Sequence, residues 1–202
     1  MRKLLRESEE VVANVLIACE YSGVVRDAFA KLGHNAVSVD FLPSETEGNH
    51  IQGDVLDVIR SQKWDLMVAF PPCTHLAVSG ARYFVEKRAD GRQQEALAFV
   101  EALLTADIPK IAIENPVGII STHIRKPDQI IQPWMFGEDA SKKTCLWLKG
   151  LPPLMATTVI KKKRYANQTP SGQNKLGPSP DRWKIRSKTY QGIADAMAQQ
   201  WG

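Results

Sequence analysis

Residues 67–75 read Met-Val-Ala-Phe-Pro-Pro-Cys-Thr-His, an apolar run that ends in two prolines and a cysteine. Each proline fixes φ and removes a backbone donor, so we expect a rigid turn that holds Cys73 at a defined point. A cysteine in such a position is a candidate nucleophile, because a thiolate attacks electron-poor carbon atoms. Free cysteines are more often small buried apolar residues, which is our interpretation of Cys19 and Cys145.

A carboxyl group is the candidate partner of this thiol. Glu114, in Ala-Ile-Glu-Asn-Pro-Val-Gly, follows an apolar run, so we expect partial desolvation to raise its pKa. A carboxyl that holds or shares a proton beside a thiolate suits attack on an electron-poor ring while a ring nitrogen is protonated. The structural alternative is a glutamate that caps a helix.

Strands and helices that would position these groups alternate along the chain. Apolar runs predict strands over residues 11–18, 36–39, 65–70, 108–113 and 144–148, and a possible strand over 155–160. Helical spacing of Val25, Ala28, Phe29 and Leu32 predicts a helix capped by Ser22.

Two further helices are predicted. Asp90-Gly91-Arg92-Gln93 has the spacing of a capping box, and residues 190–201 have helical periodicity. The order predicts an α/β fold, a doubly wound and mostly parallel sheet. Parallel sheets bind ligands at the carboxyl ends of their strands. Just beyond the ends of predicted strands lie Glu20, Asp40, Cys73 and Glu114, so we expect them to share one edge of the sheet.

The composition fits one folded unit. With 202 residues and 44% hydrophobic content, the chain can build one sizeable core. Three widely separated cysteines suggest neither a zinc cluster nor a disulfide framework, so we expect no metal site. No run approaches the roughly 20 apolar residues of a membrane span, and the first ten residues are too charged for a secretory signal. We therefore expect a soluble, cytoplasmic protein that does not bind membranes.

Positive charge is concentrated late in the chain. Residues 1–135 hold 14 Lys and Arg against 18 Asp and Glu, a balance of −4, whereas residues 136–202 hold 12 against 4, a balance of +8. Lys161, Lys162, Lys163 and Arg164 form the densest point. Such a run is either a contact for nucleic-acid phosphates or a solvated turn.

These motifs together resemble DNA cytosine-5 methyltransferases, in particular compact members encoded by bacteriophages. Phe-Pro-Pro-Cys-Thr-His-Leu-Ala-Val-Ser-Gly, from Phe70 to Gly80, is similar to the family's Pro-Cys loop, and Ile-Glu-Asn-Pro, residues 113–116, to its Glu-Asn motif. Residues 136–148, with the basic pair Lys142 and Lys143, and residues 187–194 resemble later motifs in the same order. Thr74, Leu76 and Ala77 depart from the usual Gln, Phe and Ser, and lysines stand where arginines are typical.

The resemblance implies a Rossmann-like methyltransferase fold and transfer of methyl from S-adenosylmethionine to carbon 5 of cytosine in DNA. Cys73 would add to carbon 6, Glu114 would contact ring nitrogen 3, and Lys142 and Lys143 would complete the catalytic group. The base must be flipped out of a duplex or presented single-stranded. By similarity and rim position, the cofactor residues are Glu20, Tyr21, Ser22, Gly23, Asp40, Asp54, Phe70 and Pro71.

The same resemblance divides the chain into a catalytic core at residues 1–148, a short basic segment resembling a target-recognition region at 149–188, and a C-terminal helix at 189–202. The basic segment is shorter than an ordinary domain of about 50 residues, so we expect short or relaxed sequence preference. The expected DNA contacts are Arg82, Lys161, Lys162, Lys163, Arg164 and Arg182. In the loop after Cys73, Arg82, Lys87 and Arg88 are phosphate contacts or solvated charges.

Other functions remain open at this stage. An amino-methyltransferase is disfavoured because Cys73 stands where those enzymes have an aromatic residue, and a nicotinamide dehydrogenase because the first turn lacks Gly-x-Gly-x-x-Gly. A relative that adds another one-carbon group, such as hydroxymethyl, would use the same two residues. A non-catalytic DNA-binding module, and RNA or a free nucleotide as substrate, also remain.

Overall fold

The computed structural model describes residues 12–202, which contain one seven-stranded sheet in the order β3-β2-β1-β4-β5-β7-β6. Val11, the first residue of the first predicted strand, lies outside the described residues. The strands are β1 Asn14–Ala18, β2 Asn35–Asp40, β3 His50–Gln52, β4 Leu66–Ala69, β5 Lys110–Pro116, β6 Gln129–Ile131 and β7 Thr144–Lys149.

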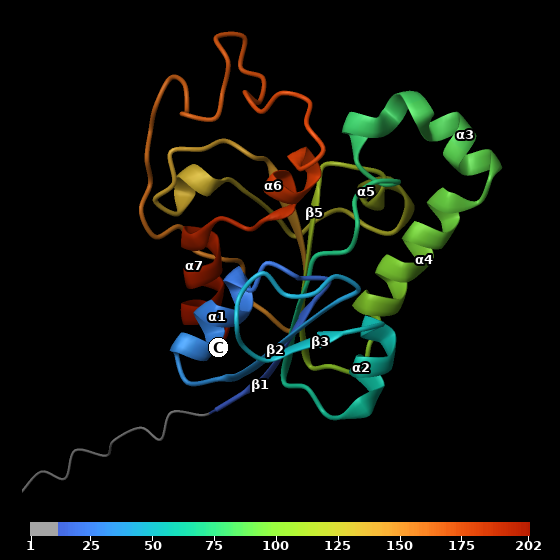
Figure 1. Ribbon diagram of the computed structural model, residues 1–202, viewed down its shortest axis with the longest axis vertical. Coiled ribbons are helices and arrows are strands. Elements are labelled where there is room, and N and C mark those ends of the chain that lie inside the picture. The colour runs from blue at the N-terminus through green and yellow to red at the C-terminus, as the bar shows by residue number, and fades with distance from the viewer. Residues whose placement is uncertain (1–11) are drawn as a thin grey trace, which may run out of the picture.

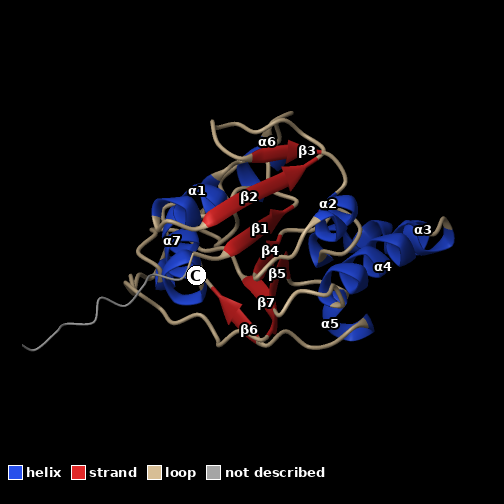
Figure 2. Cartoon of the chain, turned by 90° about the horizontal axis from the view of Figure 1, so that it is seen from below, coloured by secondary structure: helices blue, strands red, loops and turns tan. Residues whose placement is uncertain are grey.

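Helices cover both faces of this sheet (Figure 2). One layer contains α1 and α7, and the other contains α2, α4 and α5, whereas α6 lies above the sheet in Figure 1. The helices are α1 Val24–Lys31, α2 Val55–Ser61, α3 Phe84–Ala89, α4 Arg92–Leu104, α5 Ile120–His123, α6 Arg182–Ser187 and α7 Gln191–Trp201, with 3₁₀ turns at Val78–Tyr83 and Pro133–Met135.

The strand directions confirm the predicted fold class. β3, β2, β1, β4 and β5 are parallel, whereas β7 is antiparallel to β5 and β6 is antiparallel to β7. Parallel neighbours require crossover connections, and here helices on both faces supply them except between β2 and β3, which are joined by a loop. The molecule is thus a doubly wound, mostly parallel α/β protein of the Rossmann-like type.

The core consists of two apolar layers, one on each face of the sheet. Successive side chains of a strand point to opposite faces, so Val15 and Ile17 pack with α1 and α7 while Leu16 and Ala18 pack on the other side. In α7, Met197 and Trp201 are buried in the first of these layers. The C-terminal helix therefore closes one face of the core.

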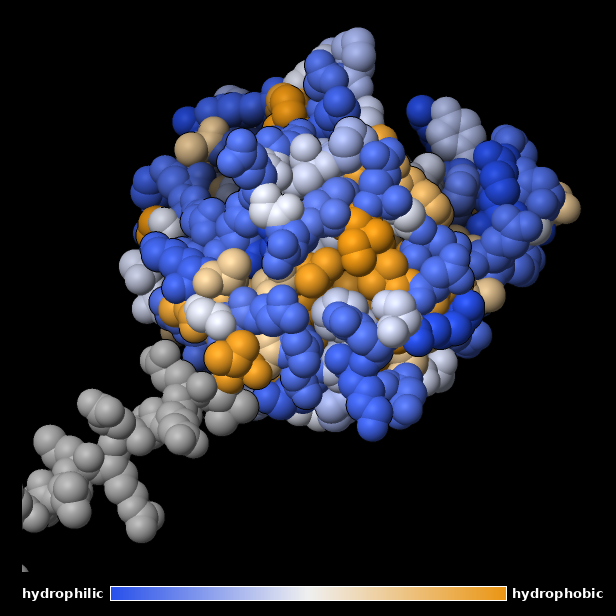
Figure 3. All heavy atoms as spheres, turned by 60° about the horizontal axis from the view of Figure 1, so that its bottom comes forward, coloured by the Kyte–Doolittle hydropathy of each residue, from blue (hydrophilic) through white to orange (hydrophobic). Residues whose placement is uncertain are grey.

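The surface seen in Figure 3 is largely hydrophilic, with apolar residues gathered near its centre. Among residues 12–202, no helix combines the length and the apolar content that crossing a membrane requires. The same residues contain no group of three His, Cys, Asp or Glu side chains arranged to hold a metal ion.

The possible strand at residues 155–160 is wrong. Thr158 forms a single bridge with Phe136, and Ile160 N donates to the Trp134 carbonyl at 2.8 Å. The segment that these residues face is a 3₁₀ turn, Pro133–Met135, which offers no regular ladder to pair with. Apolar, β-branched residues therefore remain irregular here.

The predicted helix caps are also wrong. Ser22 Oγ lies 3.4 Å from Val24 N, but the carboxylate of Glu20 accepts from the next two amides of α1. Leu32, expected on the buried face of that helix, is 42% exposed because the helix ends at Lys31.

The second cap fails at Asp90-Gly91-Arg92-Gln93. α4 begins at Arg92, so the N-cap residue is Gly91, which is left-handed with φ of 85°, and Asp90 Oδ1 accepts from Arg92 N at 3.2 Å from one position further back. The side chain of Gln93 is buried instead of reaching back to the helix start. The spacing was that of a capping box, but the chain turns at Gly91 before the helix can form.

β5 extends further than the sequence predicts, through Glu114 to Pro116. Antiparallel β7 pairs Glu114 with Leu146 and Pro116 with Thr144. Glu114 is thus part of a strand in the middle of the sheet, where its neighbours limit its movement.

Candidate active site

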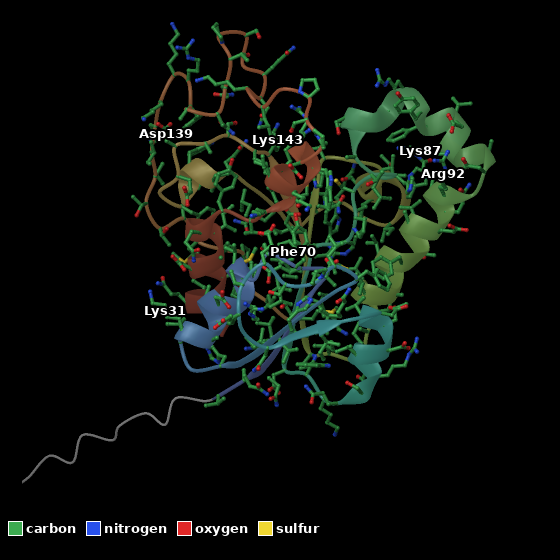
Figure 4. The ribbon with its side chains drawn as sticks, in the orientation of Figure 1. Lys31, Phe70, Lys87, Arg92, Asp139 and Lys143 are labelled. Carbon is green, nitrogen blue, oxygen red and sulfur yellow. The ribbon has the colours of Figure 1, made fainter. Side chains whose placement is uncertain are left out.

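Two predicted site residues lie side by side at the end of the sheet. Ala18 of β1 pairs with Ala69 of β4, and Ala69 pairs with Ile113 of β5. Phe70 directly follows the end of β4 and Glu114 is the next residue of β5, so the two lie at the same level of the sheet. Figure 4 shows Phe70 above the strands and Lys143 further up, beside α6.

A cavity of about 1070 Å³ opens at this edge. It is lined by residues at the ends of the strands and by several residues between 174 and 190. The expected site residues that line it are Glu20, Tyr21, Ser22, Asp40, Phe70, Pro71, Cys73, Glu114, Lys142, Lys143 and Arg182. Because ligand pockets of small molecules measure about 300–1,000 Å³, this one has room for a nucleotide-sized ligand and part of a second.

A short turn holds Cys73 just after the C-terminal end of β4. The Cys73 carbonyl accepts from Leu76 N at 3.0 Å and Ala77 N at 2.9 Å. On the other side of the thiol, Asn115 Nδ2 donates to the Pro71 carbonyl at 2.8 Å. Asn115 is 1% exposed, so this bond is shielded from water. The Glu-Asn pair of β5 thereby positions the Pro-Pro-Cys turn.

Lys87 of α3 anchors the same turn from the opposite direction. Its Nζ donates to the Thr74 carbonyl at 2.5 Å, and the residue is 7% exposed. Neither expectation for Lys87, a phosphate contact or a solvated charge, is right, because its ammonium group is buried against the loop. Arg82 lies over the Tyr83 ring at 4.6 Å, and Arg88 is exposed.

Burial sets the protonation of Glu114. Its side chain is 14% exposed, and Lys142 Nζ lies 4.0 Å from Oε1. Desolvation raises the pKa of this carboxyl, opposed by the charge of Lys142 and a hydrogen bond from Thr144. The predicted direction is confirmed. A carboxyl of this kind can hold a proton at a pH where an exposed glutamate has lost it.

The thiol of Cys73 is not activated in this state. Desolvation raises its pKa first and the charge of Glu114 second, whereas Lys142 and Arg186 oppose the rise. Cys73 therefore rests mainly as a thiol. Protonation of Glu114 would remove one of the two causes, so the two groups are coupled.

The other cysteines fit the interpretation as inert residues. Cys145 is buried in β7 with 1% exposure. Cys19 lines the cavity, but burial, followed by the charges of Asp40 and Asp54, raises its pKa to about 12. A thiol with that pKa contributes almost no thiolate at neutral pH.

The loop after β1 forms a second part of the cavity. Glu20 is buried and its carboxylate accepts from Val25 N at 2.8 Å and Arg26 N at 3.2 Å, so it stabilises the start of α1. Asp40 Oδ1 accepts from Leu42 N at 2.9 Å, and its other oxygen has no hydrogen-bond partner within residues 12–202. Asp40 can thus accept from a ligand, whereas Glu20 is largely occupied.

Several expected site residues do not line this cavity. Gly23 begins α1, and Asp54 caps α2 by accepting from Leu56 N at 2.8 Å. Arg82 also lies outside the lining, and part of the basic run lines a separate hollow of about 650 Å³. Within that run, Lys162 forms a salt bridge with Asp139 at 2.5 Å.

Residues of α6 were missed by the sequence predictions. Trp183, Ile185 and Arg186 line the cavity, although no helix was predicted within residues 149–188. The signal that could have found the helix is Ser179-Pro180-Asp181, which precedes it and is typical of a helix start.

No protein-family model and no curated protein sequence matches the chain. Among solved structures, it is similar to a protein described as a DNA modification methyltransferase encoded within an E. coli prophage, with 15% identity over 73% of this chain and 52% of that one, and a TM-score of 0.48. It is also similar to the 16S rRNA methylase RmtB, with 14% identity over 69% and 56%, and a TM-score of 0.37. The chain spans about half the length of each. The fold class rests on the strand order.

Proposed function

We propose that the protein is an S-adenosylmethionine-dependent methyltransferase that modifies carbon 5 of cytosine in DNA. The observation that carries the proposal is that the Cys73 thiol and the Glu114 carboxyl line one cavity, with the raised pKa of Glu114 suited to holding a proton. A nucleophile beside a proton donor is what addition to an electron-poor ring requires.

In the proposed reaction, Cys73 Sγ loses its proton to solvent and the thiolate forms a bond to carbon 6 of cytosine. Glu114 holds a proton at ring nitrogen 3, so the electron pair displaced from the double bond makes carbon 5 nucleophilic. When bound, S-adenosylmethionine would supply an electrophilic methyl group to carbon 5, with its sulfur–methyl bond breaking and S-adenosylhomocysteine as the leaving group. Once carbon 5 carries the methyl, it loses its proton to a base, and the pair of the bond between sulfur and carbon 6 returns to Cys73. The double bond forms again and the thiolate is regenerated.

The remaining residues are proposed to bind and orient. Lys142, 4.0 Å from Glu114, would keep that carboxyl in place, and Lys143 would add positive charge beside the base. Asp40 fits the ribose hydroxyls of the cofactor because one of its oxygens is free to accept within the described part of the chain. Tyr21 and Ser22 fit the methionine end.

The other residues expected at the cofactor are proposed to contact it or to shape its pocket. Phe70 and Pro71 line the cavity beside the thiol and would contact the methyl end of the cofactor. Glu20 and Gly23 would act through the shape of the loop that they hold at the start of α1. Asp54, which caps α2, would reach the adenine amine only by exchanging that bond.

The division of the chain into a core, a basic segment and a C-terminal helix is part of the same proposal. Residues 149–188 are too few to read many base edges, so the preferred target is short. The run from Lys161 to Arg164, with Arg82, would contact phosphates. A sharply defined methylated sequence in random DNA would contradict this.

The test is nucleoside mass spectrometry on unmodified DNA incubated with protein and S-adenosylmethionine. We expect 5-methylcytosine with the wild type and with Cys145→Ala, a matched loss of an inert cysteine, but not with Cys73→Ala. DNA containing 5-fluorocytosine should trap the protein covalently through Cys73, because fluorine cannot leave carbon 5 as a proton does. Methyl on an exocyclic amine, or methylation that survives Cys73→Ala, would refute the mechanism. A different added mass on cytosine would favour another one-carbon donor.

A further inference from the structure

One face of α6 is fastened to the loop that follows β1. Tyr21 Oη lies 3.0 Å from Ser187 Oγ and donates to the Lys184 carbonyl at 3.3 Å. The rings of Tyr21 and Trp183 lie 6.1 Å apart. Just beyond the helix, Lys188 forms a salt bridge with Glu45 at 2.5 Å. These contacts hold α6 over the cavity rather than out in solvent.

Two arginines of α6 line the same cavity as the thiol. Arg182 and Arg186 are four residues apart, so they lie on one side of the helix, about 5–6 Å apart at their Cβ atoms. Arg182 Nη1 donates to the Gly177 carbonyl at 3.1 Å. Arg186 is exposed and forms no salt bridge with any residue from 12 to 202. Arg186 lines the same cavity as Cys73, and its charge opposes the rise in the pKa of that thiol.

The charged lining of the cavity favours an anion. The basic members are Lys142, Lys143, Lys175, Arg182, Arg186 and Lys188. The acidic members are Glu20, Asp40 and Glu114, of which Glu20 is bound to the start of α1 and Glu114 has a raised pKa. An unpaired guanidinium in such a place lacks the anion that its planar donors fit.

We propose that Arg186, supported by Arg182, binds the phosphate of the nucleotide whose base reaches Cys73. This inference deepens the proposed function and rests on it for the identity of the base. The ligand chemistry is a nucleotide phosphate, from either an internal phosphodiester of DNA or a free mononucleotide. Arg186 is then a positioning residue, because it fixes the nucleotide while the thiol attacks the ring.

Binding measurements in a Cys73→Ala background test this without any chemical step. Three probes are compared: deoxycytidine, deoxycytidine 5′-monophosphate and a trinucleotide with a central cytosine. Each is titrated by calorimetry into Cys73→Ala alone and combined with Arg186→Gln or Lys184→Gln. Lys184→Gln is the matched control, because it removes the same charge from the same helix, where Lys184 Nζ lies over the Trp183 ring and not in the cavity lining.

We expect at least one of the phosphate-bearing probes to bind about tenfold or more tightly than deoxycytidine, as one charge-assisted contact allows. Arg186→Gln should abolish that advantage and Lys184→Gln should preserve it within about twofold. A preference for the trinucleotide identifies the source as DNA, and a preference for the monophosphate identifies a free nucleotide.

Equal binding of all three probes, or equal losses with Arg186→Gln and Lys184→Gln, would overturn the inference. The proposed reaction fails separately, because it is judged by the methylated product. Phosphate-dependent binding through Arg186 without any methylated cytosine would retain this site and reject that reaction.

Discussion

Asn115→Ala tests whether β5 positions the nucleophile. Asn115 Nδ2 donates to the Pro71 carbonyl at 2.8 Å, two residues before Cys73, and the side chain is 1% exposed. Removing the donor loses a hydrogen bond and leaves a buried carbonyl without a partner, which costs about 1–3 kcal/mol. Asn115 Oδ1 is already unpartnered in the described structure, so its removal adds no penalty.

The cost should appear in the turn and in the reaction rate. If the turn must be re-formed for each attack, about 1–3 kcal/mol corresponds to a roughly 5- to 150-fold lower kcat. The first assay is methyl transfer, and the second is the rate at which iodoacetamide alkylates Cys73, followed by intact mass. Asn174→Ala is the control, because this exposed cavity residue also makes a local bond, to Leu176 N at 2.8 Å.

Asn115→Asp sharpens the test. An ionised carboxylate cannot donate, so it would place a second acceptor against the Pro71 carbonyl. We expect it to be less active than Asn115→Ala at neutral pH. The reasoning is refuted if Asn115→Ala matches the wild type in kcat, alkylation rate and denaturation midpoint, or if Asn174→Ala reproduces its losses.

Three further outcomes are expected. Glu114→Gln should be inactive yet more stable than the wild type near pH 8. The pKa of Glu114 is higher in the folded than in the unfolded protein, so ionising the buried carboxyl lowers the free energy of unfolding at pH values above the unfolded-state pKa. The difference should vanish below about pH 4, where both states are protonated; equal denaturation midpoints at both pH values would contradict it. Gly118→Ala should destabilise the protein by about 1–3 kcal/mol, since a Cβ would meet the Leu76 carbonyl oxygen, whereas Gly53→Ala has open space and should be nearly neutral in the same melt. Lys163→Ala should weaken binding to all DNA sequences alike and lower the salt slope by about 1, and a sequence-dependent loss would speak against a phosphate contact.

Local patterns were enough for the central strands and the terminal helix. Residues 66–70 and 111–113 are continuous apolar runs, which is typical of strands buried on both faces, and they lie in or directly after β4 and β5. The edge strands β3 and β6 have three residues each and carry polar side chains, so only pairing with β2 and β7 makes them strands. Residues 155–160 face a segment that contains a 3₁₀ turn rather than a strand, so they form one bridge and no β-strand.

The cap at the start of α1 shows the same limit. Serine at a helix start is a sound local signal, but Glu20 competes for the same amides once the fold brings it close. The burial of Lys87 depends likewise on how α3 packs against the loop after Cys73. The spacing of residues along the chain cannot predict the capping by Glu20 or the burial of Lys87, because each depends on groups brought together by tertiary contacts.

The sequence by itself determined the doubly wound fold and the two residues on which the proposed chemistry rests, because Pro-Pro-Cys and an apolar run before Glu114 are local features. Only the tertiary structure decided their state. Burial raises the pKa of both Cys73 and Glu114, and the charge of Glu114 raises the pKa of Cys73 further, whereas Lys142 opposes both shifts. The position of Arg186 over the cavity was decided in the same way, because the contacts that hold α6 come from Tyr21, more than 160 residues earlier in the chain.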